Sequence, residues 1–158
     1  MNRESEMTQI SRRLLTAAAV VAGFAATSRA AEKAKEHRIV FQVDQNDPAV
    51  MNLTLNNVTN LMEYYHDKGE QAQIEVVAYG PGLNMFREDK SPVKDRIARL
   101  KSGAFPSNVA FSACGNTKKG MEKAEGHEIA IIPEATIVPA GVVRLTELQE
   151  QGWSYIRP

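Results

Sequence analysis

The sequence predicts an α/β domain with a mainly parallel sheet of about five strands and helices on both faces. Short runs rich in β-branched and aromatic residues alternate along the chain with segments of helical periodicity. One run, Ile74–Gly80 (IEVVAYG), is almost continuously apolar, which is typical of a strand buried on both faces. The 158 residues contain no internal repeat and no low-complexity linker. Alternating strands and helices of this kind favour right-handed βαβ units within one domain.

The first half of the domain has two strands and one long helix. The run His37–Val43 (HRIVFQV) predicts the first strand, and Ile74–Gly80 predicts the second. Between them, Ala49–His66 has helical periodicity, with Asp47 as the expected N-cap and proline at the first helical position. The apolar residues that form one stripe of this helix are Met51, Leu55, Val58, Met62 and Tyr65.

The middle of the chain continues the alternation. The segment Gly80–Phe86 (GPGLNMF) predicts a turn at the end of the second strand. Ser91 and Pro92 then open a helix over Val93–Ser102, whose core-facing residues are expected to be Val93, Ile97 and Leu100. The run Asn108–Cys114 (NVAFSAC) predicts the third strand.

The last part of the chain predicts two more helices and two more strands. A short helix is expected in the segment GNTKKGMEKAEG that follows Cys114, and a fourth strand over Ala135–Val138. A helix then begins at Pro139-Ala140-Gly141 and runs to about Gln151. Trp153–Ile156 predicts the final strand.

Residues 1–30 read as a targeting segment that precedes the domain at residues 31–158. Ser11-Arg12-Arg13 comes before a weakly hydrophobic, alanine-rich stretch, Leu14–Thr27, and Ser28-Arg29-Ala30 puts small residues at the positions that a signal peptidase reads. This stretch is shorter than the roughly 20 residues that a membrane-spanning helix needs. Adjacent arginines before such a core resemble a bacterial twin-arginine signal, which predicts export to the periplasm. An ordinary secretory signal and an uncleaved amphipathic anchor are the alternatives.

Composition excludes several classes of partner. The chain has 19 basic and 19 acidic side chains, so no net charge draws it to nucleic acid or to anionic lipid, and no stable membrane association is expected after signal cleavage. His37, His66 and His127 lie far apart and lack the spacings of metal ligands. We therefore expect no metal and no other cofactor.

Loops that follow the strands are where a ligand site is expected, because ligands of open parallel sheets bind at the carboxyl ends of the strands. The four loops that should meet there are Asp44–Asp47, Gly80–Leu83, Cys114–Thr117 and Pro139–Gly141. Cys114, the only cysteine, ends a strand and precedes a helix, and a helix N-terminus stabilises a thiolate. Gly115 allows close approach, while Asn116 or Thr117 can cap the helix and donate hydrogen bonds. A lone cysteine is, however, often a buried and inert side chain.

Four segments together resemble the DsrE/DsrF-like family, specifically its exported branch of small single-domain proteins. They are RIVFQV with the following DP and MNLTLNNVTNL, then IEVVAYGPGLNMF, SACGNTKKG and IVPAGVVRLTELQEQGWSYIRP. The likeness covers about Arg38 to Pro158, nearly the whole predicted mature chain. It implies a compact domain around a parallel sheet, layered like Rossmann and flavodoxin folds.

The resemblance also implies a chemistry. Members commonly assemble as homotrimers, hexamers or hetero-oligomers, and the best understood cytoplasmic members carry sulfur as a persulfide on one cysteine. Cys114 follows the third strand, where that cysteine is expected. The resemblance thus suggests a carrier of sulfane sulfur, at most a sulfurtransferase, with donor and acceptor proteins as partners. This chain differs from those members because its sequence predicts export. The resemblance implies no particular activity for the exported branch.

The sequence therefore leaves three functions open. The first is a thiol protein in which Cys114 carries sulfur and Gly115, Asn116 and Thr117 stabilise its anion. The second is an oligomeric binding module for a small anionic or nucleotide-like ligand. Its crevice would be lined by Asn46, Tyr79, Gly82, Asn116 and Pro139. The third is a structural partner of another exported protein, with Cys114 buried at an interface.

Overall fold

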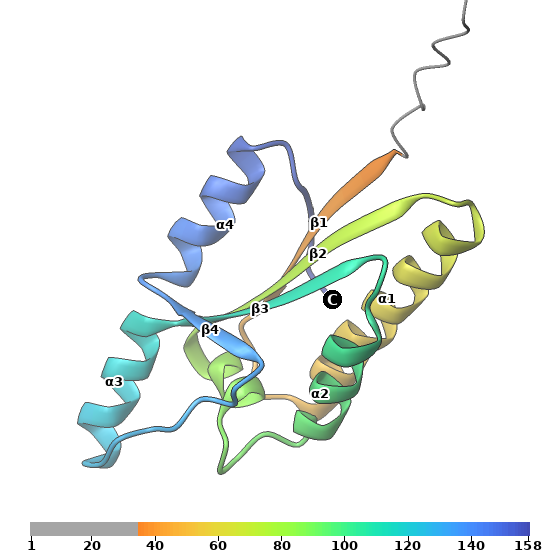
Figure 1. Cartoon of the computed structure of the whole chain (residues 1–158). Helices are drawn as coiled ribbons and strands as arrows, with labels where there is room; N and C mark the ends of the chain where they lie inside the picture. Colours follow the sequence, from red (N-terminus) through yellow and green to blue (C-terminus); the bar gives the residue numbers. More distant parts are fainter. Residues whose placement is uncertain (1–34) are drawn as a thin grey trace, which may run out of the picture. The chain divides into compact units, whose positions relative to one another are not determined.

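A computed structural model describes residues 35–158 and contains an open parallel sheet with helices on both sides (Figure 1). Strand and helix alternate along the chain as the sequence predicts. The elements are β1 (Glu36–Val43), α1 (Pro48–Asp67), β2 (Gln71–Ala78), the 3₁₀ helix η1 (Gly80–Phe86), α2 (Lys94–Gly103), β3 (Asn108–Cys114), α3 (Gly115–Glu125), β4 (Ala135–Val138), α4 (Gly141–Glu150) and β5 (Ser154–Ile156).

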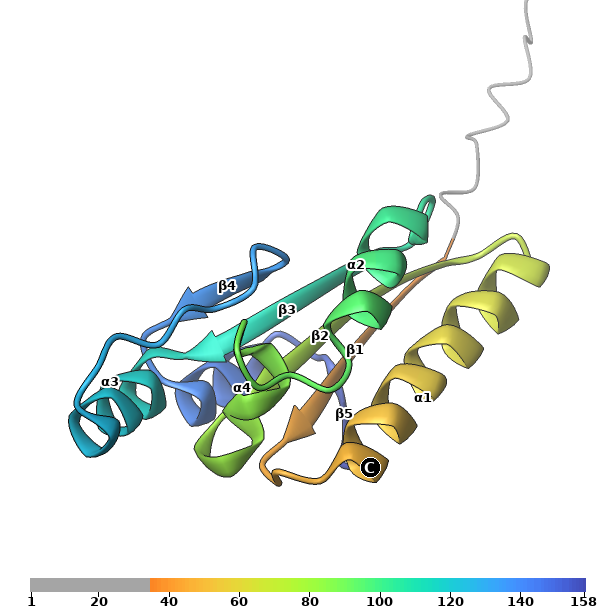
Figure 2. The same cartoon turned by 90° about the horizontal axis from the view of Figure 1, so that it is seen from below.

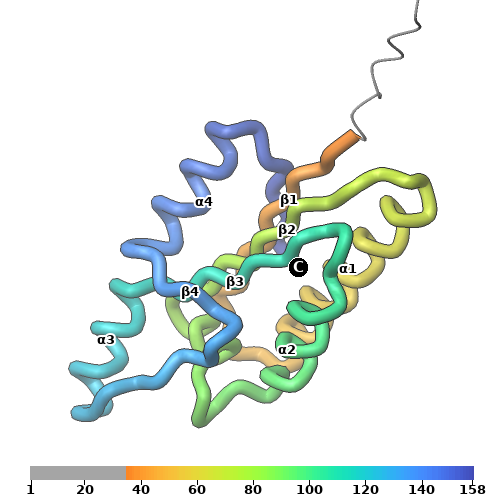
Figure 3. The backbone as a smooth tube through the Cα atoms, in the orientation of Figure 1, coloured from red at the N-terminus to blue at the C-terminus, as the bar shows by residue number. Residues whose placement is uncertain are grey.

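The five strands form one sheet in the order β4-β3-β2-β1-β5, and every pairing is parallel. Val43 pairs with Ala78, and Cys114 pairs with Val138 at the other side of the sheet. Because the strands are parallel and in register, their carboxyl ends all lie at one edge, as the tube drawing shows for β1 to β4 (Figure 3). The predicted fold class is confirmed.

Two faces of the sheet carry different helices. The larger core lies between the sheet and α1, α2 and η1, and Met121 of α3 packs against it. A smaller cluster joins Val40 and Val77 of the sheet to Leu145 and Leu148 of α4 on the opposite face. Figure 2 shows α4 behind the sheet, with α1 and α2 in front.

This arrangement creates a switch point between β3 and β4. From β1 to β4, each new strand is added on the same side of the previous one, and right-handed crossovers place the connecting helices on one face of the sheet. The connection from β4 to β5 runs in the opposite direction, so a right-handed crossover places α4 on the other face. Consequently β3 leads into α3 while the neighbouring β4 leads into α4 on the opposite side. Open α/β sheets bind ligands at such a point, just beyond the strand ends.

Local sequence explains how α1 begins and how its core stripe is placed. The carboxylate of Asp47 accepts the amide of Ala49 at 2.7 Å, and Pro48 is the first helical residue, so the predicted N-cap is confirmed. Met51, Leu55 and Val58 are buried, while the predicted core residues Met62 and Tyr65 are half-buried.

The segment predicted as a turn after β2 is instead the 3₁₀ helix η1. The amide of Gly82 donates to the carbonyl of Tyr79 at 3.1 Å, and Gly80 has a positive φ of 51°. Gly82 sits against the main chain of β1, and a Cβ there would lie 2.2 Å from the carbonyl oxygen of Val43. This approach lets the segment fold back over the end of β1.

We expect Gly82→Ala to lower the free energy of unfolding by roughly 3 kcal/mol, because overpacking against main chain cannot be relieved by a rotamer change. Gly120→Ala is the matched control, because a Cβ at Gly120 meets nothing within 4 Å. Urea denaturation of both variants measures the difference. Equal stabilities of the two variants would contradict the expectation.

A buried arginine fastens the loop after η1 to α3. Arg87 is only 1% exposed, and its guanidinium binds Asp89 at 2.9 and 2.7 Å and both carboxylate oxygens of Glu125. Lys90 also donates to Glu125. The hydrogen bonds from Arg87 and Lys90 lower the pKa of Glu125 to about 2, and the hydrogen bond from Arg87 lowers the pKa of Asp89.

The lowered pKa of Glu125 makes its contribution to stability depend on pH. The unfolded carboxyl titrates near 4.5, so the stabilisation is complete above that pH and is lost as the pH falls toward 2. We therefore expect Glu125→Gln to destabilise the protein at pH 7, and the gap between variant and wild type to shrink between pH 5 and pH 2. Unfolding free energies measured at each pH test this expectation. A gap that stays constant across this range would contradict it.

Predictions for residues 1–30 fall outside the described part of the chain, so the signal segment remains a prediction. Within residues 35–158, none of the helices combines the length and apolar character needed to cross a membrane.

Candidate functional site

Cys114 stands directly at the junction between β3 and α3. It is the last residue of the strand and the N-cap of the helix, and its sulfur accepts the amide of Thr117 at 3.4 Å. The prediction that Asn116 or Thr117 caps this helix is therefore wrong. The helix begins at Gly115 with no intervening loop, which leaves Cys114 in the cap position. The residue is buried, with 5% of its surface exposed.

A second helix starts beside the same sulfur. α4 begins at Gly141, where a Cβ would lie 2.9 Å from the Cβ of Tyr79 and 3.3 Å from the Cβ of Cys114. No side chain caps α4, since Ala140 occupies its N-cap position. Amides at a helix start lack partners within the helix and carry partial positive charge. Cys114 thus lies between the N-termini of α3 and α4.

Opposing effects act on the acidity of the Cys114 thiol. Burial raises its pKa, but hydrogen bonds from the side chain of Thr117 and from the amides of Gly141, Thr117 and Asn116 lower it. The hydrogen bonds prevail, so the pKa lies below the ordinary value of 9.0. Donors of this kind stabilise the thiolate, which is the nucleophilic form of cysteine.

Hydrogen bonds link several other predicted site residues around Cys114. The hydroxyl of Thr117 accepts the amide of Gly80 at 2.9 Å, which ties the end of β2 to the start of α3. The amide of Asn116 donates to the carbonyl of Pro139 at 3.2 Å, which ties α3 to the end of β4. Gly115 is buried, and a Cβ there would lie 3.0 Å from the carbonyl oxygen of Val138. Three of the four expected loops therefore meet around Cys114, and the fourth touches the second, because a Cβ at Gly82 would lie 2.9 Å from the Cα of Asp44.

Other predicted crevice residues lie around or outside this group. Tyr79 is half-buried and touches Gly141, whereas Gly82 packs on the main chain of β1. Asn46 is exposed in the loop between β1 and α1, and no hydrogen bond joins its side chain to Cys114 within residues 35–158. Of the predicted crevice residues, Tyr79 and Pro139 thus lie beside the start of α3 or α4, while Gly82 lies against the end of β1.

Thr117→Val is expected to slow alkylation of Cys114 at pH 7 roughly tenfold. Valine keeps the shape and the amide but removes the hydroxyl, which lowers the pKa of Cys114 and accepts the amide of Gly80. A hydrogen bond to a charged group is worth about 1.5–3 kcal/mol. Thr117→Ser keeps the hydroxyl and is the control. Alkylation rates measured across pH with a small reagent test this expectation. A variant titration midpoint equal to that of wild type would contradict it.

Sequence reasoning missed a buried polar cluster on the sheet face beneath α4. Glu75 of β2 accepts hydrogen bonds from Ser112 of β3 and from Arg144 of α4. The available signal was a glutamate inside an otherwise apolar strand, IEVVA. Such a residue needs a buried partner, and the sequence does not name that partner.

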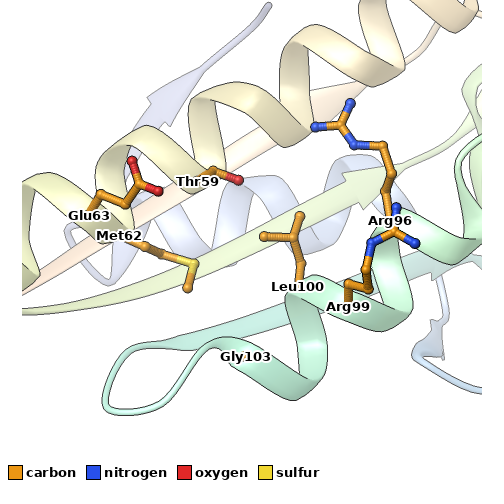
Figure 4. Close-up of a pocket in the computed structure, with 7 residues that line it drawn as sticks. All are labelled: Thr59, Met62, Glu63, Arg96, Arg99, Leu100 and Gly103. Carbon is orange, nitrogen blue, oxygen red and sulfur yellow. The ribbon is translucent and has the colours of Figure 1, made fainter.

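A separate hollow of about 370 Å³ lies between α1 and α2 (Figure 4). Its lining includes Glu63 of α1 together with Arg96 and Arg99 of α2. These helices cover the face of the sheet opposite α4, so the hollow is not part of the thiol site. The side chains of Asn52 and Asn56 accept hydrogen bonds from Arg96.

Comparison with known proteins identifies one family. The model of the DsrE/DsrF-like family matches residues 37–158. A solved structure of a protein of unknown function from Methanobacterium thermoautotrophicum is 34% identical in sequence, with a TM-score of 0.64. The match covers 77% of this chain and 99% of that one. A search of curated proteins found no match.

Proposed function

Because this chain belongs to the DsrE/DsrF-like family, we propose that it is a sulfur-relay protein that carries sulfane sulfur as a persulfide on Cys114. The observation that carries the proposal is the position of the chain's only cysteine between the N-termini of α3 and α4, where the amide of Thr117 donates a hydrogen bond to its sulfur. A lowered pKa gives a larger thiolate fraction near neutral pH, which is what attack on a sulfur donor requires.

Thiosulfate illustrates the chemistry of loading. The Cys114 thiolate attacks the outer, sulfane sulfur of thiosulfate, a new sulfur–sulfur bond forms, and the old bond breaks as sulfite leaves with its electron pair. Three negative charges enter the step and three leave it, shared between the persulfide anion and sulfite. An acceptor thiolate then attacks the outer sulfur of the persulfide and restores the Cys114 thiolate. No metal or redox cofactor is needed for this exchange.

The absence of a second cysteine suits a carrier. A neighbouring thiol would attack the persulfide and release its sulfur with formation of an internal disulfide. With one cysteine in 158 residues, a loaded chain has no such internal route. Its sulfur can leave only to another molecule.

Intact-mass measurement tests the proposal directly. The purified protein is incubated with polysulfide or thiosulfate, and we expect a gain of about 32 Da that a reductant removes. Protein alkylated at Cys114 beforehand is the control and should gain nothing. An unchanged mass, with a thiol that alkylates only after unfolding, would assign Cys114 to packing.

Assembly with other subunits is a second candidate role, and a specific observation favours it. Cys114 is nearly buried, while Val142 and Val143 of α4 and Ile137 of β4 are each more than half exposed near it. Exposed apolar side chains in a group often mark an interface. A homotrimer or hexamer, or a complex with another exported protein, would cover them. Light scattering of wild type and Val143→Asp tests this role, with dissociation of the variant expected.

Export to the periplasm is part of the proposal, and it rests on Arg12, Arg13 and the apolar stretch that follows them. Replacing both arginines by lysine should leave the uncleaved chain in the cytoplasm if the twin-arginine route is used. Cell fractionation followed by intact-mass measurement distinguishes the processed chain from the full one. Periplasmic, processed protein from the lysine variant would point to an ordinary secretory signal.

A further inference from the structure

The sheet face beneath α4 holds a buried ion pair close to the thiol. Glu75 of β2 is 2% exposed. Its carboxylate accepts two hydrogen bonds from Arg144, one from Nε at 2.8 Å and one from Nη2 at 2.7 Å. The hydroxyl of Ser112 in β3 donates to the same carboxylate at 2.6 Å. The hydrogen bond with Glu75 raises the pKa of Arg144, so this guanidinium stays charged.

Net stabilisation does not readily explain such a pair. Removing two charges from water costs about as much as their attraction returns, and apolar residues of similar size often serve stability equally well. What the pair does supply is geometry, because a two-pronged guanidinium–carboxylate contact fixes both distance and orientation. The pair therefore orients the part of the protein to which Arg144 belongs.

Arg144 belongs to the first turn of α4. Its amide donates to the carbonyl of Ala140 at 3.0 Å, which is the first hydrogen bond of that helix. The same turn contains Gly141, where Tyr79 and Cys114 leave no room for a side chain. Since no side chain caps α4, contacts elsewhere must hold this turn in place.

The ion pair is anchored on the two strands that end at the site. Ser112 lies two residues before Cys114 in β3, and Glu75 lies four residues before Tyr79 on the chain of β2. Both strands therefore transmit the position of Arg144 to the place where α4 meets the thiol. A shift of the guanidinium would move Gly141 relative to Cys114.

We propose that Glu75 and Arg144 are positioning residues for the thiol: their buried ion pair holds the first turn of α4, and with it Gly141, against Cys114. This inference rests on the proposed function of Cys114 as a sulfur carrier. It adds that the reactivity of the carrier is set from α4 as well as from α3.

Charged and titratable groups near the thiol do not obscure the test. On α3, Lys118 is paired with Glu122, and β4 (ATIV) has no charged residue. Burial and the neighbouring Asp44 raise the pKa of Tyr79 above its ordinary value of 10.0, so this phenol stays neutral below pH 9. Of the three charged residues of α4, Arg144, Glu147 and Glu150, only Arg144 lies in the first turn, and Glu147 approaches it only at 3.9 Å.

The experiment compares Glu75→Gln and Arg144→Lys with Glu147→Gln in the full chain. Glu75→Gln keeps size and removes charge, and Arg144→Lys keeps charge and removes the two-pronged contact. Glu147→Gln removes an exposed carboxylate on the same helix and leaves the buried pair intact. Alkylation by iodoacetamide is followed across pH, which separates the titration midpoint from the plateau rate at high pH. Thermal unfolding of each variant is measured in parallel.

The midpoint is the decisive quantity, because better access to the thiol changes the plateau and loss of a donor changes the midpoint. We expect Glu75→Gln and Arg144→Lys to move the midpoint to higher pH and to slow alkylation at pH 7 roughly three- to tenfold, as loss of one donor would. The Glu147→Gln profile should match wild type. A wild-type midpoint in both pair variants, with only a lower unfolding temperature, would assign the pair to stability alone.

Failure of this inference is distinguishable from failure of the proposed function. Wild type that gains sulfur while the pair variants keep the wild-type midpoint overturns only the positioning role. Wild type that gains no sulfur overturns the carrier role, and the alkylation profiles still report whether the pair acts on the thiol.

Discussion

Cys114→Ser is expected to abolish sulfur loading completely while changing the free energy of unfolding by less than about 1 kcal/mol. The sulfur atom is the proposed nucleophile, and a serine hydroxyl is not ionised near neutral pH. Serine is nevertheless a favoured N-cap, so its oxygen can accept the amide of Thr117 in place of the sulfur. Intact-mass measurement after thiosulfate treatment, together with urea denaturation, tests both halves of the expectation.

Two results would contradict this expectation in different ways. Sulfur gain by the serine variant would place the adduct on another group and remove Cys114 from the mechanism. A loss of several kcal/mol in stability would mean that the thiol acts mainly in packing. The Thr117→Ser variant keeps both Cys114 and the hydroxyl at position 117. It controls for effects of mutation and purification that do not involve the thiol.

Arg87→Ala is expected to lower the free energy of unfolding by about 3–5 kcal/mol, which is the usual cost of truncating a large buried side chain to alanine. Arg87 is fully enclosed and binds two carboxylates, and its loss also leaves a cavity next to the core. Because domains of this size are stable by only 5–15 kcal/mol, the effect should be easily measured in urea.

Arg96→Ala is the matched control for this arginine. Its guanidinium binds the side chains of Asn52 and Asn56 at the helix surface and forms no ion pair within residues 35–158. We expect the control to cost less than about 1 kcal/mol. If Arg87→Ala cost no more than Arg96→Ala, the buried cluster would not hold the loop after η1 to α3.

Strands and helices of this domain were largely predictable because their signals are local. The helical stripe from Met51 to Val58 repeats every three to four residues, and Asp47 with Pro48 marks where the helix begins. The apolar run in β2 indicated a strand buried on both faces. The exception was Gly80–Phe86, where a turn was expected and a 3₁₀ helix forms, because the close packing of Gly82 on β1 is a tertiary contact.

The candidate site was only partly predictable. The position of Cys114 between a strand and a helix follows from the pattern, and so does its placement at the sheet edge. The sequence did not predict that Cys114 itself is the N-cap of α3. A shift of one residue in the start of the helix decides whether a loop separates it from β3, and sequence patterns do not place a helix start that accurately. The loop containing Gly141 was expected at the site, but its direct contact with Cys114 and the Glu75–Arg144 pair were not predicted, because these contacts join residues 27 and 69 positions apart.

The sequence by itself determined the order and type of the elements, the single thiol, and its position at the end of a parallel strand. These features depend on periodicity, capping and residue count, which act over a few neighbouring residues. Only the tertiary structure decided that α4 starts against the same sulfur as α3, and that a buried ion pair holds it there. The physical reason is that these contacts join residues far apart in the sequence. The direction of the crossovers and the packing of buried charges decide which residues become partners, and no local sequence pattern encodes that choice.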